Sequence, residues 1–183
     1  FDKSKSMLDI LSDDADSEHV AIFASQILTI LSNRMYGYRI PCAKGLVTFD
    51  SNISFNCPIT IFSSDFENEC LIDFSIDESK KMLYDSILFS CEEIFKFRKN
   101  ILGNEIYQNA KSRIIVITDG KDIGSTIKID DLIKILLKNN VIVDSIIINT
   151  KRNNDPNQML LAISRITGGY SFRLDHSQII NLL

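Results

Sequence analysis

The sequence predicts an α/β protein with an open, mostly parallel, Rossmann-like sheet, helices on both faces and an antiparallel edge hairpin. Three observations predict this fold class. Residues 113–118 and 141–148 are nearly unbroken apolar runs, which is the composition of parallel strands buried on both faces. Helical patterns alternate with these runs along the second half of the chain. Residues 45–50 and 53–57 form two short β-branched segments on either side of a turn.

The first half of the chain contains one helical pattern and the hairpin. Apolar residues recur at three-and-four spacing from residue 16, which predicts an amphipathic helix that ends at Gly37. Residues 45–50 and 53–57 then predict the two strands of a hairpin at the sheet edge. Residues 62–78 are polar and acidic, and their pattern favours neither a helix nor a strand.

The second half of the chain alternates helices and strands. A stripe of apolar side chains predicts a long helix from Ser79, and residues 99–111 have the composition of a loop. The buried strand over 113–118 ends at Asp119 and Gly120. The remaining expected elements are a helix over 130–138, a strand over 141–148, a helix over 158–166, a strand over 170–173 and a closing helix over 177–183.

Composition bounds the domain organisation and the partners. The 183 residues are 45% hydrophobic and 24% charged, which is the profile of a single domain over residues 1–183. A strand must precede Phe1 in the predicted sheet, so we expect this domain to be cut from a longer chain with its first strand truncated. The net charge of −4 argues against nucleic acid or an anionic membrane as the main partner. The sequence has no apolar run long enough to cross a bilayer.

The four cysteines bear on the compartment. They form no CxxC pair and have no histidine at metal-ligand spacing. We therefore expect reduced thiols, with Cys91 buried in a helix, and a cytoplasmic or other intracellular location. Asn52-Ile-Ser54 is a formal glycosylation sequon, which leaves a secreted origin open.

Oxygen-bearing side chains gather at two predicted strand ends. Asp2, Ser4 and Ser6 alternate along the first loop, and Asp119 follows the strand over 113–118. Ligands of parallel sheets bind at the carboxyl ends of the strands, so these side chains can face one centre. Carboxylate and hydroxyl oxygens suit Mg²⁺ or Mn²⁺. The spacing therefore indicates a candidate cation site.

Five motifs resemble those of a von Willebrand factor type A (VWA) domain, in order and spacing over essentially the whole chain. They are Asp2-Lys-Ser-Lys-Ser-Met7, Leu46-Val-Thr-Phe49, Leu83-Tyr-Asp-Ser-Ile87, Ile115-Val-Ile-Thr-Asp-Gly120 and Ile166-Thr-Gly-Gly-Tyr170. The resemblance implies a metal-ion-dependent adhesion site in which Asp2, Ser4, Ser6 and Asp119 hold the cation. It also implies that an acidic side chain of a partner protein fills the last position on the metal.

One residue departs from the pattern of that family. Lys81 stands where the resemblance places the threonine that completes the metal site. Two interpretations follow. Either the site still binds Mg²⁺ or Mn²⁺, or the Lys81 ammonium pairs with Asp2 and Asp119 and takes the place of the cation.

The sequence supports three functional hypotheses, of which the first is a protein–protein interaction module that binds its partner at the sheet-top site. The second is a metal-independent scaffold domain within a larger protein, which the resemblance extends to proteins of the ubiquitin pathway. The third is a Mg²⁺-dependent hydrolase or phosphotransferase that uses Asp2. Ser4 stands where such an enzyme needs a proton-donating acid, and neither His19 nor His176 has a triad partner. We therefore expect a non-enzymatic binding domain.

Overall fold

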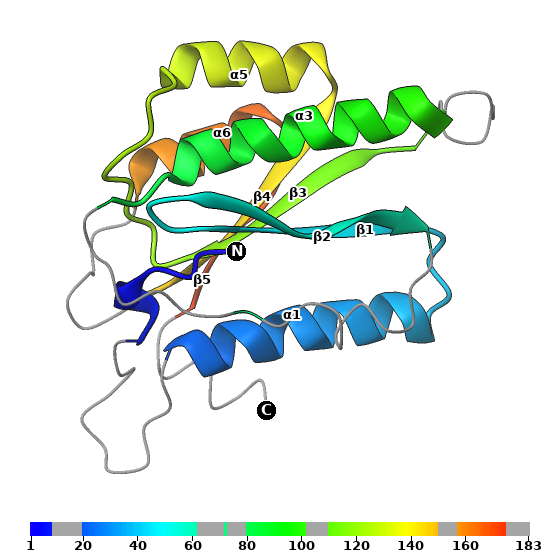
Figure 1. The fold of residues 1–183 in the computed structure, drawn as a ribbon, viewed down its shortest axis with the longest axis horizontal. Coiled ribbons are helices and arrows are strands. Elements are labelled where there is room, and N and C mark those ends of the chain that lie inside the picture. The colour runs from blue at the N-terminus through cyan, green and yellow to red at the C-terminus, as the bar shows by residue number, and fades with distance from the viewer. Residues whose placement is uncertain (9–19, 62–71, 73–79, 102–109, 150–156, 175–183) are drawn as a thin grey trace.

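The computed structural model describes residues 1–8, 20–61, 72, 80–101, 110–149 and 157–174 (Figure 1). Its elements in chain order are the 3-10 helix η1 (Lys5–Leu8), α1 (Val20–Gly37), β1 (Ala43–Phe49), β2 (Ile53–Ile61), α3 (Leu83–Ile101), β3 (Ser112–Thr118), α5 (Ile129–Lys138), β4 (Val141–Ile148), α6 (Gln158–Ile166) and β5 (Ser171–Leu174). No helix in these ranges is both long enough and apolar enough to serve as a membrane span.

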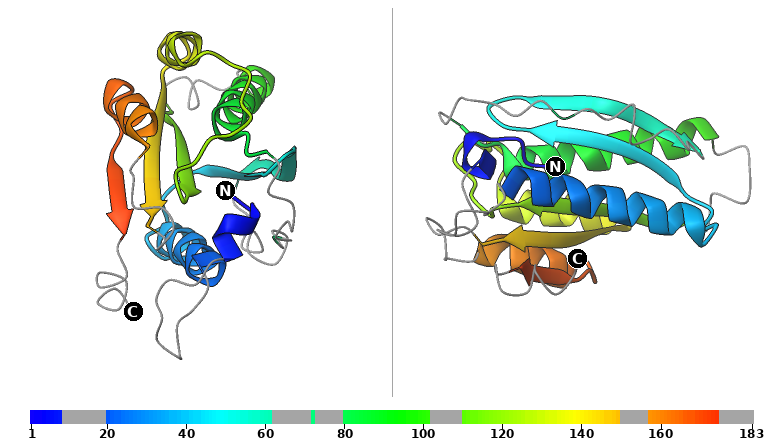
Figure 2. Two further views of the ribbon diagram at one scale, coloured as in Figure 1. Left: turned by 90° about the vertical axis from the view of Figure 1, so that its left-hand side faces the viewer. Right: turned by 90° about the horizontal axis from the view of Figure 1, so that it is seen from below.

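The described strands form two sheets. β3, β4 and β5 are parallel and hydrogen-bonded in that order, whereas β1 and β2 form an antiparallel hairpin. Helix α1 lies on one side of the strands, and α3, α5 and α6 lie on the other (Figures 1 and 2). This arrangement confirms the predicted α/β class with helices on both faces, although the hairpin and the parallel strands are separate sheets.

Side-chain alternation along β3 divides the core between the two faces. Ile117 packs in a cluster with Val20 and Phe23 of α1, whereas Ile114 and Val116 pack in a second cluster with Leu83 of α3. Neighbouring residues of a strand point to opposite faces, so a strand that is apolar throughout contributes to both clusters. The unbroken apolar run therefore has the environment that its composition predicts.

The first three residues connect the two sheets. The amide of Asp2 donates to the carbonyl of Ile117 in β3 at 2.9 Å, and Asp2 also forms a parallel bridge with Phe49 of β1. The amide of Lys3 donates to the carbonyl of Phe49 at 3.0 Å. The N-terminal segment lies between β3 and the hairpin in Figure 2. Asp2 is thus held at the ends of both strands.

Several element boundaries differ from those predicted. β2 runs to Ile61 rather than to residue 57, and α3 continues to Ile101, into the predicted loop over 99–111. The η1 turn has no counterpart among the predicted elements. The predicted first helical residues 16–19, the Ser79 helix start and the closing helix over 177–183 lie outside the described residues.

The cysteines divide into two states. Cys42 and Cys91 are free thiols, and Cys91 is buried in α3 as expected. Its pKa is raised to about 11, chiefly by burial, so it is protonated at neutral pH. Cys57 is disulfide-bonded, and the expectation of a reduced thiol is wrong for this residue. The cytoplasmic or other intracellular location stays a prediction.

Candidate functional site

Two separate parts of the chain bring the predicted site residues together. Asp2 lies in the segment that connects the two sheets, Ser4 and Ser6 follow it at the η1 turn, and Asp119 directly follows β3. Asp2 and Asp119 have 0% and 1% of their surface exposed, and Ser4 has 4%. The predicted oxygens therefore form one cluster at the carboxyl end of the parallel strands, in which Asp2, Ser4 and Asp119 are buried and Ser6 is half-buried.

Lys81 occupies the centre of this cluster. Its Nζ lies 2.5 Å from Oδ2 of Asp2 and forms a second ion pair with Oδ1 of Asp119. The same nitrogen donates to Oγ of Ser6 at 3.2 Å. Only 3% of Lys81 is exposed. One ammonium group therefore bridges the loop, the strand end and the segment that precedes α3.

The carboxylate of Asp2 is also bound by neutral donors. Ser4 donates to Oδ1 through its amide at 3.0 Å and through its hydroxyl at 2.6 Å. The hydroxyl of Thr118 donates to Oδ2 at 2.6 Å. Ser4 and Ser6 share a further hydrogen bond of 3.1 Å between their hydroxyls. Because a buried carboxylate needs such donors, these contacts keep the loop in place.

Electrostatic pairing overcomes burial at both ends of the Lys81–Asp119 contact. Burial alone would raise the pKa of Asp119, but the Lys81 ammonium and hydrogen bonds from Ser6 and Lys121 lower it below its ordinary value. Burial alone would lower the pKa of Lys81, but Asp2 and Asp119 raise it. Both groups are therefore charged at neutral pH.

Three residues close to Asp119 in the sequence also position this cluster, namely Thr118, Gly120 and Asp122. Thr118 binds Asp2 and also accepts a hydrogen bond from the amide of Gly120 at 3.0 Å. Gly120 has φ +93°, a conformation that lets the chain turn away from Asp119. Asp122 accepts from the amide of Leu83 at 2.9 Å, so it caps α3 just after Lys81. The only available signal was their closeness in sequence to Asp119.

With Lys81 in this position, the cluster does not fit Mg²⁺ or Mn²⁺. A divalent cation needs its oxygen ligands at about 2.0–2.2 Å, and the oxygens of Asp2 and Asp119 that would supply them already contact the ammonium. A metal ion there would meet the positive charge of Lys81 at close range. Among the described residues, no group of three His, Cys, Asp or Glu side chains could hold a metal ion.

Lys5, between the two serines, is exposed. His19 and His176 lie outside the described residues.

Comparisons with known proteins address the fold. No family model matches the chain. A curated protein of Acanthamoeba polyphaga mimivirus, named "Probable bifunctional E2/E3 enzyme R795", is 30% identical to this chain over 141 residues. That match covers 76% of this chain but only 10% of the viral protein.

Two solved structures show what the fold resembles. The VWA domain of SpRpn10 aligns with 100% of this chain and 91% of its own, with a TM-score of 0.63 and 17% identity. The human COPII-coat protein Sec24c aligns with 85% of this chain and 28% of its own, with a TM-score of 0.52 and 9% identity. The chain therefore has a VWA-like fold.

Proposed function

We propose that this domain is a protein–protein interaction module that works without a metal ion, as a scaffold part of a larger protein. The observation that carries the proposal is the contact of one lysine, Lys81, with both Asp2 and Asp119. In this arrangement the ammonium takes the structural role of a metal ion, because it offsets negative charge and connects three segments of the chain.

The charge at the site favours recognition that does not use a partner's carboxylate. Asp2 and Asp119 contribute two negative charges and Lys81 one positive charge, so the cluster carries a net charge of −1. A bound divalent cation would attract an acidic side chain, whereas this buried cluster repels one. We therefore place partner recognition on the surrounding loops rather than on an acidic anchor at the site.

The same geometry disfavours a hydrolase that uses Asp2 as nucleophile. Asp2 is fully buried, accepts hydrogen bonds from Ser4 and Thr118, and forms an ion pair with Lys81. A nucleophile must reach the reacting atom of a substrate. Substrate could approach this carboxylate only if the cluster opened. The proposal is accordingly a binding role.

The mimivirus relative suggests a ubiquitin-pathway context for this module. Its name describes a bifunctional E2/E3 enzyme, and the match accounts for a tenth of its length. We propose that the present domain likewise serves a ubiquitin-pathway protein as a non-catalytic part.

A binding titration tests this context. The chain is titrated with ubiquitin, or with a ubiquitin-conjugating (E2) domain, in buffer that contains either Mg²⁺ or EDTA. We expect binding of equal affinity in both buffers, and no binding to either probe would contradict the ubiquitin-pathway context.

Calorimetric titration with Mg²⁺ and Mn²⁺ tests the role of Lys81. We expect no binding by the wild-type chain, because the ammonium occupies the oxygen cluster. We expect measurable binding by Lys81→Thr, which removes the ammonium and adds a hydroxyl ligand. Lys80→Thr is the matched control, since Lys80 is adjacent but exposed. Metal binding by the wild type would contradict the metal-independent form.

A further inference from the structure

The turn between α1 and β1, residues 34–41, exposes large apolar side chains to solvent. It lies at the end of the molecule opposite η1, on the right in Figure 1. Tyr36 and Tyr38 have 61% and 77% of their surface exposed, and Ile40 has 47%. Large apolar side chains that gather in one exposed turn are typical of an interaction site.

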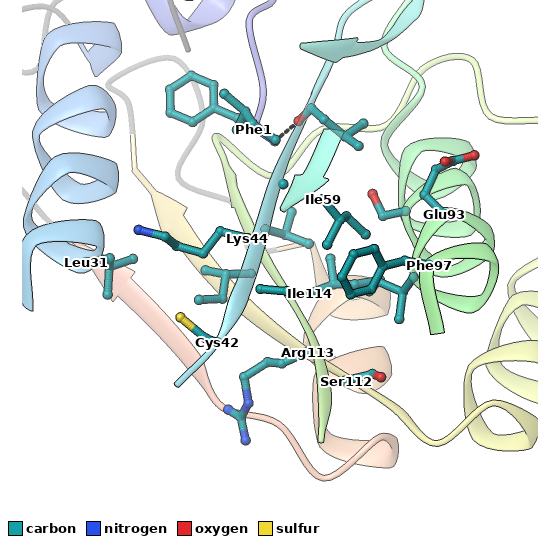
Figure 3. Close-up of a pocket in the computed structure, with 18 of the residues that line it drawn as sticks. Phe1, Leu31, Cys42, Lys44, Ile59, Glu93, Phe97, Ser112, Arg113 and Ile114 are labelled. Carbon is teal, nitrogen blue, oxygen red and sulfur yellow. Dashed lines mark hydrogen bonds between the residues drawn. The ribbon is translucent and has the colours of Figure 1, made fainter. Parts of the chain in front are cut away.

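Backbone hydrogen bonds give this α1–β1 turn one defined shape. The amide of Ile40 donates to the carbonyl of Met35, and the amide of Arg39 donates to the carbonyl of Tyr36, both at 2.9 Å. This is the Schellman pattern that ends many helices. On its inner side the turn adjoins the cavity of about 770 Å³ drawn in Figure 3, whose lining includes Met35 and Pro41. The inner side of the turn therefore packs on the fold, whereas its outer side faces solvent.

Arg39 adopts a backbone conformation that is unfavourable for an arginine. Its φ is +52°, in the left-handed region. The residue at this place of a Schellman motif is usually glycine, because a side chain there crowds the backbone. Gly37 stands two residues earlier, where φ is not positive. Unfavourable backbone conformations of this kind gather at functional sites. The chain therefore has an arginine where stability alone favours glycine.

The charge around the turn has a single sign. No acidic residue occurs between residues 20 and 49, although the whole chain has a net charge of −4. The basic residues of this stretch are Arg34, Arg39 and Lys44. Lys44 donates to the hydroxyl of Ser32 at 2.8 Å. Both arginines are exposed, and within the part of the chain that the structure describes neither forms an ion pair. Their guanidinium groups can therefore bind carboxylates of another molecule.

We propose that the α1–β1 turn is a second interaction surface, which binds an acidic segment of a partner protein. The guanidinium groups of Arg34 and Arg39 pair with carboxylates of that segment. Tyr36, Tyr38 and Ile40 contact its apolar side chains. Tyrosine and arginine are enriched among the residues that contribute most to protein–protein binding. Two guanidinium groups would neutralise only a few phosphates, so the surface favours a protein over a nucleic acid.

Fluorescence anisotropy with two labelled peptides tests the proposal. The acidic probe alternates Glu with Phe and Leu, and its counterpart has Lys in place of every Glu. We expect the wild-type chain to bind only the acidic peptide, with an affinity that falls as salt is added. Arg34→Glu/Arg39→Glu should weaken this binding by about tenfold or more. Lys5→Glu/Lys80→Glu is the matched control, because it makes the same change of charge at exposed residues near η1. It should leave the affinity within about twofold.

Two further variants separate binding from stability. Tyr36→Ala/Tyr38→Ala should weaken binding of the acidic peptide by about tenfold, because the apolar contacts are lost. Arg39→Gly should weaken it by about threefold or more, since one charge pair is lost. The same change should raise the Tm by about 2–4 °C, because glycine accepts φ +52° without crowding. An unchanged affinity of Arg39→Gly would contradict the proposal, and so would a lower Tm.

No binding of the acidic peptide, or equal binding of its Lys counterpart, would overturn the proposal. So would an equal loss of affinity in Lys5→Glu/Lys80→Glu, because the peptide would then bind at the η1 end. Affinity that rises tenfold or so in Asp65→Asn/Glu67→Gln/Glu69→Gln would make the chain's own acidic residues the occupant, and the proposal would be wrong. Phosphatidylserine vesicles and single-stranded RNA are the remaining probes. If either binds through the two arginines while the acidic peptide does not, the partner is not a protein.

Discussion

Phe1 and Asp2 are neighbours in the chain, but their surroundings differ in kind. The side chain of Asp2 lies in a polar cluster that the chain completes by itself, with Lys81 where a cation would otherwise be needed. The backbone nitrogen of Phe1 faces an apolar cavity between two strand edges. In the first region, the carboxylate of Asp2 is bound by the ammonium of Lys81 and by the hydroxyls of Ser4 and Thr118. The second region is an apolar cavity of about 770 Å³.

This difference shows that the residues of a binding motif can be held together by a side chain of the same chain. Four oxygen-bearing side chains converge as the motif predicts, but the fifth position decides what holds them together. The cavity, by contrast, is lined mainly by apolar side chains of β1, β3, α1 and α3. Each of the following predictions perturbs one side of this comparison.

The largest effect is expected from removing the cation of the polar cluster. Lys81→Met leaves the carboxylates of Asp2 and Asp119 buried together without a counter-charge. We expect the free energy of unfolding at pH 7, measured by urea denaturation, to fall by about 3–5 kcal/mol. Lys80→Met is the control and should change it by less than about 0.5 kcal/mol, since Lys80 is exposed. A small effect of Lys81→Met would show that the cluster is not held by its ion pairs.

A somewhat smaller effect is expected from titrating the Phe1 amine. Its pKa is lowered from 8.0 to about 6 in the fold, so between these values the unfolded chain binds more protons. Stability therefore rises with pH across this window, by roughly 3 kcal/mol in total. Acetylating the amine removes its charge and should remove this part of the pH dependence. Identical profiles for the free and acetylated chains, measured by denaturation from pH 5 to 9, would contradict the burial of the amine.

The smallest effect concerns a neutral donor in the polar cluster. Thr118→Val keeps the shape of the side chain but removes the hydrogen bond to Asp2. We expect a loss of about 1–3 kcal/mol in the free energy of unfolding, because a buried carboxylate loses a donor. The control is Thr126→Val, whose hydroxyl bonds Asp85 at an exposed position. Equal losses for the two variants would mean that Lys81 and Ser4 alone satisfy Asp2.

Much of the fold follows from local pattern. The apolar runs at β3 and β4 and the helical periodicity of α1, α3, α5 and α6 predict these elements to within a few residues. Errors fall at the ends, as with the extra residues of β2 and α3, where local propensity competes with tertiary packing. The separation of the hairpin from the parallel sheet depends on contacts between distant segments, and it did not follow from any local pattern.

The candidate site shows the same division. Asp2, Ser4, Ser6 and Asp119 could be named because their spacing and their places at strand ends are properties of the sequence. The capping role of Asp122 and the donor role of Thr118 could not, since each depends on a partner brought near by folding.

By itself, the sequence determined which oxygens gather at the end of the central strands and which residue is foreign to the motif. Only the tertiary structure shows that the Lys81 ammonium lies against Asp2 and Asp119, because the direction of a long flexible side chain depends on what surrounds it. Two buried carboxylates attract the ammonium inward, where it forms both ion pairs. The cavity beside Phe1 likewise exists only in three dimensions, since it is defined by the edges of strands that are far apart in the chain.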